Sequence, residues 1–328
     1  MEYTITLILK KTRRIILKQK LKRYPVALTG IALGISGLGG ALATIFGNGI
    51  LYLCVMIAAC LLTIILIKNL LYPQILLEEL RHPTASGVVP TFDMALMIIA
   101  SVVVNINPLL GKILWWIAII LHAICLGFFL KNRIQNFAWD HIIPSWFVPP
   151  IGIVTASVTG SQMGFSLVSQ SIFYIGFTFY LVMLPMMFYR VIFVNPIEEA
   201  RLPSFGIMAA PPSLCLAGYL TAFPDPNILI IAVLVGLALC STSLVYMSMF
   251  RIWKIKFSPM YASYTFPLAI GSTAMIKIAD YFNTVNHEFY TIFRIISYVE
   301  LTIAVIVIIY IFIKLHIWVY HNIHKNSV

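Results

Sequence analysis

Apolar stretches long enough to cross a lipid bilayer follow one another along almost the whole chain. A helix needs about 20 consecutive apolar residues to span the hydrocarbon core, and short polar connections separate the stretches found here. This pattern predicts an all-α integral membrane protein with ten transmembrane helices and no room for a separate soluble domain. We place the helices at residues 25–46, 49–67, 92–108, 110–130, 147–162, 165–188, 204–222, 227–249, 259–279 and 290–315.

The charged residues are few and unevenly placed. Of the 328 residues, 61% are hydrophobic and 10% are charged, whereas a soluble domain carries about 25% charged residues. Most of the 22 lysines and arginines fall within residues 1–24 or in alternate connections. Because Lys and Arg accumulate on the cytoplasmic side, we expect both termini in the cytoplasm and the chain in the cell (plasma) membrane. The net charge of +11 is then a topology signal, and no nucleic acid partner is expected.

The chain divides into three expected parts. These are a basic cytoplasmic segment at 1–24, a ten-helix transmembrane domain at 25–316 and a cytoplasmic tail at 317–328. Two interpretations of the basic segment stay open: a topology determinant, or an amphipathic helix lying on anionic lipid. The five cysteines fall singly within apolar stretches, which is typical of packing residues. We expect no metal and no cofactor.

Prolines recur near the starts of the odd-numbered stretches, which indicates an internal repeat of helical hairpins. They are Pro25, Pro90, Pro150, Pro212 and Pro267. A proline inside a membrane helix frees a backbone carbonyl, and lipid tolerates this only where protein or a cavity surrounds it. The repeat therefore predicts that the odd-numbered helices lie inside the bundle.

Residue size divides the stretches in the same way. Odd-numbered stretches are rich in Gly, Ala, Ser and Thr, whereas even-numbered ones are bulky and apolar almost all round, as expected for helices that face lipid. Close helix packing is the alternative use of small residues, and it stays open for Gly30, Gly34 and Gly37. The combined pattern favours two concentric rings around a passage. Its predicted lining is Gly30, Gly34, Pro150, Gly152, Thr155, Pro212, Ser213, Pro267 and Gly271.

Short motifs spread over most of the chain resemble the tellurite-resistance/dicarboxylate transporter family. That family also includes fungal sulfite and malate transporters and the slow anion channels of plant guard cells. The motifs occur in the family's order, which makes the resemblance specific although no single motif decides it. They are Thr29-Gly-Ile-Ala-Leu-Gly34, Asn107-Pro-Leu109, Pro144-Ser-Trp-Phe-Val-Pro149, Gly206-Ile-Met-Ala-Ala-Pro-Pro212 and Tyr264-Thr-Phe-Pro267.

This resemblance implies a fold, an assembly and a gate. The fold has five helical hairpins with pseudo-fivefold symmetry around a central pore, and the assembly is a homotrimer. The implied gate is Phe266, beside the kink at Pro267, where a ring forms a hydrophobic constriction for hydrated ions. The chain departs from the family's bacterial members at Ala32 and near Asp93, where those members have prolines.

Ionisable residues within the apolar stretches are candidates for function, because an unpaired charge at the bilayer centre costs about 3 kcal/mol or more. Asp93 either caps a helix or carries a proton for coupled transport. Lys277 either attracts anions to an outer vestibule or pairs with Asp280 or Glu288. Glu300 favours an interhelical pair over a transport role.

His122 reads as a hydrogen-bonded packing residue, and no enzyme motif is present. The leading hypothesis is a channel or transporter for small inorganic or carboxylate anions, gated by Phe266. An apolar, neutral lumen suits conduction rather than tight recognition. The alternative is a proton-coupled transporter of malate-like dicarboxylates or sulfite, with Asp93 or Glu300 as the proton carrier.

Overall fold

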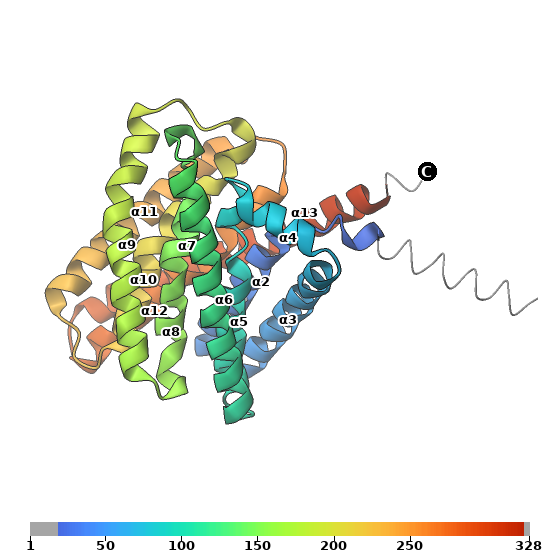
Figure 1. Ribbon diagram of the computed structural model, residues 1–328. Helices are drawn as coiled ribbons and strands as arrows, with labels where there is room; N and C mark the ends of the chain where they lie inside the picture. The colour runs from blue at the N-terminus through green and yellow to red at the C-terminus, as the bar shows by residue number, and fades with distance from the viewer. Residues whose placement is uncertain (1–18, 325–328) are drawn as a thin grey trace, which may run out of the picture.

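The computed structural model describes residues 19–324, and within this range every regular element is a helix (Figure 1). Eight of the described helices are long and apolar enough to cross a membrane. The α-helices are α2 (Ala27–Phe46), α3 (Asn48–Leu71), α4 (Pro73–Arg81), α5 (Thr91–Val103), α6 (Pro108–Gln135), α7 (Val148–Ile151), α8 (Thr155–Thr159), α9 (Ser166–Phe193), α10 (Ala210–Ala222), α11 (Ile228–Ile252), α12 (Thr265–Thr284) and α13 (Phe289–His324).

Tighter 3₁₀ helices lie between these elements and precede several of the inner ones. They are η1 (Ala85–Gly87), η2 (Trp139–His141), η3 (Pro144–Phe147), η4 (Gly152–Val154), η5 (Gly160–Met163), η6 (Glu199–Ala209) and η7 (Pro259–Tyr264). Proline lies within η3, η6 and η7, and it removes a backbone donor and favours short turns over a continuous α-helix. The stretch predicted as one helix at 147–162 is in fact broken into the series η3, α7, η4, α8 and η5.

Inner and outer helices differ in burial as the sequence predicted. In α2, in η1 with α5, and in η6 with α10, 67–83% of the most apolar stretch is buried, against 22–39% in α3, α6, α9, α11 and α13. The inner elements contact one another in a closed order, α2 to α5, α5 to α8, α8 to α10, α10 to α12 and α12 back to α2. Each inner element also contacts the outer helix that follows it.

The outer helices carry buried cations where they end, on the side of the bundle at which the inner elements begin. We call this side the proline end. Lys68 Nζ lies 2.6 Å from Glu79 Oε1, Arg133 Nη2 donates to the carbonyl of Arg81 at 2.6 Å, and Arg190 Nη1 donates to the carbonyl of Asn195 at 2.6 Å. These contacts fasten the connecting segments to the helices that precede or follow them.

Helix α13 is longer than the sequence predicted. It continues to His324, so most of the stretch expected as a tail at 317–328 is helical. Its C-terminal end lies beside the first described residues of the chain (Figure 1), where Arg23 Nη1 donates to the carbonyls of Asn322 and Ile323, both at 3.2 Å. Most of the basic segment expected at 1–24 lies outside the described residues.

Candidate functional site

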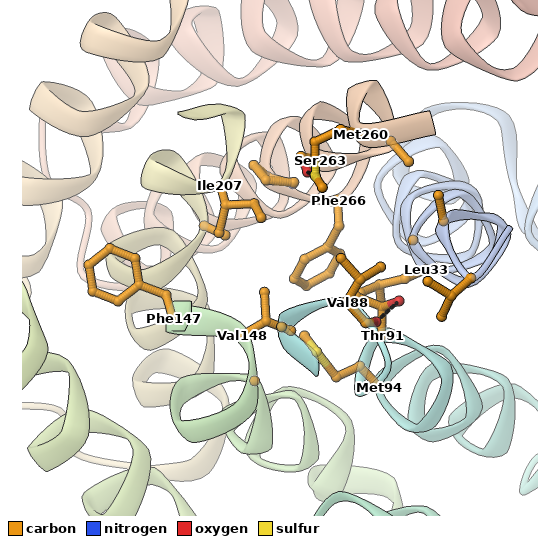
Figure 2. Close-up of a pocket in the computed structure, with 18 of the residues that line it drawn as sticks. Leu33, Val88, Thr91, Met94, Phe147, Val148, Ile207, Met260, Ser263 and Phe266 are labelled. Atoms are coloured by element: carbon orange, nitrogen blue, oxygen red, sulfur yellow. Dashed lines mark hydrogen bonds between the residues drawn. The ribbon is translucent and has the colours of Figure 1, made fainter. Parts of the chain in front are cut away.

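A cavity of about 210 Å³ lies within the ring of inner elements, at the proline end (Figure 2). Every inner element or the 3₁₀ helix before it contributes to the wall. Representative lining residues are Gly30 and Leu33 from α2, Thr91 and Met94 from α5, Val148 from α7 and Gly152 from η4, Ile207 from η6 and Leu214 from α10, and Ser263 from η7 and Phe266 from α12.

Phe266 lies in the first turn of α12, and Figure 2 shows its ring directed into the cavity. Only 6% of the residue is exposed, and Pro267, which also lines the cavity, follows it directly. On α2, the ring faces Gly37: a Cβ atom at that position would lie 3.6 Å from Cδ2 and 3.7 Å from Cε2 of Phe266. A glycine at this point leaves free space beside the ring.

The cavity wall is apolar and carries no charged side chain. Among the described residues, no Asp, Glu, Lys or Arg lines it. Its hydroxyl groups have partners, since Thr91 Oγ1 shares a hydrogen bond of 2.6 Å with Thr29 and donates to the carbonyl of Val88 at 2.8 Å. His82, at the mouth, accepts hydrogen bonds through Nδ1 from the backbone of Thr84 and Ala85. Such a wall offers weak contacts to an ion rather than a binding site.

The structure brings three of the predicted lining residues and the predicted gate residue to the cavity, and it leaves the other six lining residues outside it. Gly30, Gly152, Phe266 and Pro267 line the wall. Other predicted residues pack between elements instead. They are Gly34, Pro150, Thr155, Pro212, Ser213 and Gly271.

The two glycines among them have close neighbours that explain the correction. A Cβ at Gly34 would lie 2.4 Å from the Cβ of Thr265, so this glycine permits close approach of α2 and α12. A Cβ at Gly271 would lie 2.9 Å from Glu300 Oε2 on α13. Both positions serve helix packing, which was the alternative reading for Gly34.

A stripe of partly exposed residues continues beyond Phe266, away from the proline end. Along α12 from residue 266 to 279, only Thr273 and Lys277 are partly exposed. Lys277 lies 11 positions after Phe266, about three turns at 3.6 residues per turn, and therefore on the same face. On the neighbouring α2, the first residues with any exposure are Gly37 and Gly40. These residues of α2 and α12 lie beyond Phe266 as seen from the proline end.

Lys277 forms no ion pair with any described residue, so the alternative of a pair with Asp280 or Glu288 is not found in the described structure. Asp280 pairs with Arg294 on α13 instead. Thr273 and Lys277 are the partly exposed residues in an otherwise buried stretch of α12. Asp280 lies close enough to interact electrostatically with the Lys277 ammonium group.

Asp93 does not line the cavity, although the next residue, Met94, does. Its carboxylate lies 2.5 Å from Nδ1 of His122, and only 2% of Asp93 and none of His122 is exposed. His122 is therefore hydrogen-bonded, as the sequence indicated, but its partner was missed. The signal was present: residues 93 and 122 lie at nearly equal distances from the turn at Asn107, and an antiparallel hairpin brings such positions together.

Glu300 lies on α13, behind α12 as seen from the cavity. It is 5% exposed, and its Oε2 has no hydrogen-bond partner among the described residues. Thr242 and Tyr246 of α11 lie in the same region. The expected interhelical ion pair is not found in the described structure.

The fold and the cavity define a class of protein: a membrane-spanning helical bundle with an uncharged hollow enclosed by its inner helices. Comparison with protein families agrees with this class. Residues 23–316 match the family model SLAC1, described as voltage-dependent anion channel. The chain belongs to this family, which confirms the resemblance drawn from the motifs.

Two relatives from Methanocaldococcus jannaschii are similar to parts of the chain. The uncharacterized transporter MJ0762 is 28% identical over 155 residues, which cover 43% of this chain and 45% of the relative. The uncharacterized transporter MJ0576 is 25% identical over 178 residues, which cover 50% of this chain and 51% of the relative. The chain thus spans about half the length of the curated relatives it matches.

Proposed function

We propose that this protein conducts small anions passively through a pore enclosed by its inner helices, with Phe266 as the gate. The observation that supports the proposal most directly is the uncharged cavity that all the inner elements border and into which the Phe266 ring is directed. Such a wall binds ions weakly, and weak binding allows an ion to leave as readily as it enters. In this proposal the five hairpins are arranged with pseudo-fivefold symmetry and supply ten crossings.

The gate works by excluding water and hydrated ions. An aromatic ring across a narrow apolar passage makes a hydrophobic constriction that opens only when the ring moves. Pro267 follows Phe266 directly, in the first turn of α12, and has no backbone N–H to bond to the preceding turn. Gly37 places no side chain beside the ring. The ring is therefore not held by a side chain at this point of α2.

The two sides of the constriction differ in charge. The proline end, which we assign to the cytoplasm together with both termini, leads into the apolar cavity. The opposite face carries Lys277 without an ion partner, and a cation there raises the local concentration of anions. Selection then depends on how readily an anion sheds water. We propose a plasma membrane location and a homotrimeric assembly in which each subunit has its own pore.

One observation favours a second candidate, a proton-coupled transporter of dicarboxylates or sulfite. Glu300 is a buried carboxyl group with an unpartnered oxygen beside the gate helix, and such groups carry protons in membrane transporters. Asp93 supports this candidate less, because His122 already holds its carboxylate away from the cavity.

Anion flux through purified protein in liposomes tests the proposal, with a matched pair of variants. Phe266→Ala removes the ring and is expected to raise the flux of chloride and nitrate without a pH gradient. Phe282→Ala is the control, because Phe282 lies on the same helix and is 7% exposed, against 6% for Phe266, but does not line the cavity. Equal flux in both variants refutes the gate. Flux that requires a pH gradient, and disappears in Glu300→Gln, supports the second candidate.

A further inference from the structure

The third inner segment, from η3 to η5, is the part of the cavity wall where the helix is broken. Pro149 and Pro150 have no backbone N–H, and η4 replaces α-helical turns directly after them. A broken helix leaves carbonyl groups without their usual partners, and a buried carbonyl needs a partner from elsewhere. Val148 and Gly152, on either side of the break, both line the cavity. A contact that fixes the backbone at the break therefore also fixes this part of the cavity wall.

A side chain from the neighbouring outer helix bonds to one of the carbonyls in the broken segment. His122 of α6 places Nε2 2.8 Å from the carbonyl oxygen of Pro149. A carbonyl only accepts hydrogen bonds, so Nε2 carries a hydrogen and donates it. The other ring nitrogen, Nδ1, lies 2.5 Å from Asp93 Oδ1 on α5. The imidazole thus joins three elements: α5, α6 and the broken segment.

The Asp93 contact fixes the orientation of the imidazole. With Nε2 committed as a donor, Nδ1 and the carboxyl group share one proton, which either partner holds while the hydrogen bond is kept. The thiol of Cys125, one turn further along α6, also interacts with the Asp93 carboxyl group. Space around the ring is tight, because a Cβ at Gly152 would lie 3.0 Å from His122 Cε1 and 2.6 Å from Met94 Sδ.

The same face of α6 holds the broken segment at a second point. Trp115 Nε1 donates to Thr159 Oγ1 at 3.0 Å, and both groups are buried. His122 and Trp115 are two turns apart on α6, so one helix fastens the segment on both sides of η4. The outer helix serves as a rigid support for an inner segment that does not form a continuous helix.

We propose that His122, oriented by Asp93, is a positioning residue that fixes the cavity wall at the break and thereby sets the anion selectivity of the pore. This inference rests on the proposed function. A fixed wall keeps the passage narrow, so a strongly hydrated anion is disfavoured relative to a weakly hydrated one. A released wall widens the passage and admits water, which lowers that preference.

The hydrogen-bond relay allows a test by exchange of its polar groups. In His122→Gln, the amide nitrogen donates to the Pro149 carbonyl, but the amide oxygen faces the Asp93 carboxylate, and two acceptors repel each other. Adding Asp93→Asn supplies an N–H for that oxygen and completes the relay without a shared proton. A role in packing alone predicts no such rescue, because the second substitution changes almost no volume.

The measurement is the nitrate-to-chloride permeability ratio of the full chain in liposomes, with each variant first checked for a monodisperse, folded protein. We expect the ratio to fall severalfold toward unity in His122→Gln, because the wall is no longer fixed at the break, and to recover in His122→Gln/Asp93→Asn. The melting temperature should likewise fall in His122→Gln and recover in the double variant. A single variant with the wild-type ratio, or a double variant no better than the single one, overturns the inference.

Failure of the proposed function gives a different result. If the wild-type protein and Phe266→Ala carry neither anion, the pore is refuted, and the melting temperatures alone then report on the relay. If the wild-type protein conducts but the His122 variants keep its selectivity, the pore stands and the positioning role is refuted.

Discussion

Replacing Gly37 by alanine tests the gate from the opposite wall. The new methyl group would lie 3.6 Å from Cδ2 and 3.7 Å from Cε2 of Phe266, and 3.6 Å from the Cβ of Ala269. These are ordinary contact distances, so the methyl group fits without displacing its neighbours. It fills the space beside the closed ring, and we expect it to stabilise the closed state.

The size of the effect follows from these contacts. A close pair of carbon atoms contributes about 0.1–0.2 kcal/mol, so the two ring contacts add about 0.2–0.4 kcal/mol to the closed state. Because about 1.4 kcal/mol corresponds to a tenfold change in an equilibrium, the open population should fall about 1.4- to 2-fold. The substitution should also stabilise α2 by about 0.5–1 kcal/mol, since glycine is unfavourable within a helix.

The assay is chloride efflux from liposomes at equal protein content, with Gly40→Ala as the matched control. Gly40 lies one turn further along α2, and a Cβ there meets no atom within 4 Å, so it gains the same helix stability without touching the ring. Gly37→Ala should slow efflux, whereas Gly40→Ala should not. In the Phe266→Ala background, Gly37→Ala should have no effect. Slower efflux in that double variant, or unchanged efflux in the single one, refutes the reasoning.

Three further outcomes are expected from other parts of the structure. Lys277→Gln should reduce anion current severalfold at 0.01 M salt and little at 1 M, where the Debye length is about 3 Å; equal loss at both concentrations contradicts an electrostatic role. Gly111→Ala should lower the free energy of unfolding by about 1–3 kcal/mol, because its Cβ would lie 2.4 Å from the Cα of Val104; thermal unfolding in detergent measures this. Glu300→Gln should leave the melting temperature unchanged or raise it, because no ion pair is lost; a lower melting temperature would reveal a partner.

The division into inner and outer helices was predictable from the sequence, because it depends on the types of residue in each helix. Prolines and small residues identified the inner elements, and bulky apolar residues identified the outer ones. Phe266 was indicated by the resemblance of Tyr264-Thr-Phe-Pro267 to the family's motif, and its place directly before a proline on a helix of small residues agreed with this. To predict that Phe266 reaches the cavity, it was enough to know roughly where Pro267 lies along its apolar stretch.

The rotation of each inner helix about its own axis, which decides the residues that face the cavity, was not predictable in the same way. A 3₁₀ helix turns by about 20° more per residue than an α-helix, and η6 precedes α10 over 11 residues. The direction in which α10 faces therefore depends on how much of the segment adopts each geometry. This explains why Pro211 lines the cavity whereas the predicted Pro212 does not.

Contacts within one hairpin can be recovered by counting from the turn. The pair of Asp93 and His122 joins α5 to α6, and the pair of Asp280 and Arg294 joins α12 to α13. The two residues of each pair lie at nearly equal distances from the turn between their helices. Contacts between hairpins, such as the hydrogen bond from Thr265 Oγ1 of α12 to the carbonyl of Gly30 of α2, have no such rule, because they depend on the rotation of two helices that no short turn joins.

Each inner element contacts the outer helix that follows it in the chain, and this has a consequence for how such pores diversify. One sector of the wall and its support are encoded together in a single continuous stretch, as residues 85–135 are for α5 and α6. Exchange of one such stretch between homologous chains would replace one sector of the cavity wall while leaving the other sectors in place. In the proposed pore, new conductance properties can then arise by recombination of whole hairpins rather than by coordinated change across distant parts of the chain.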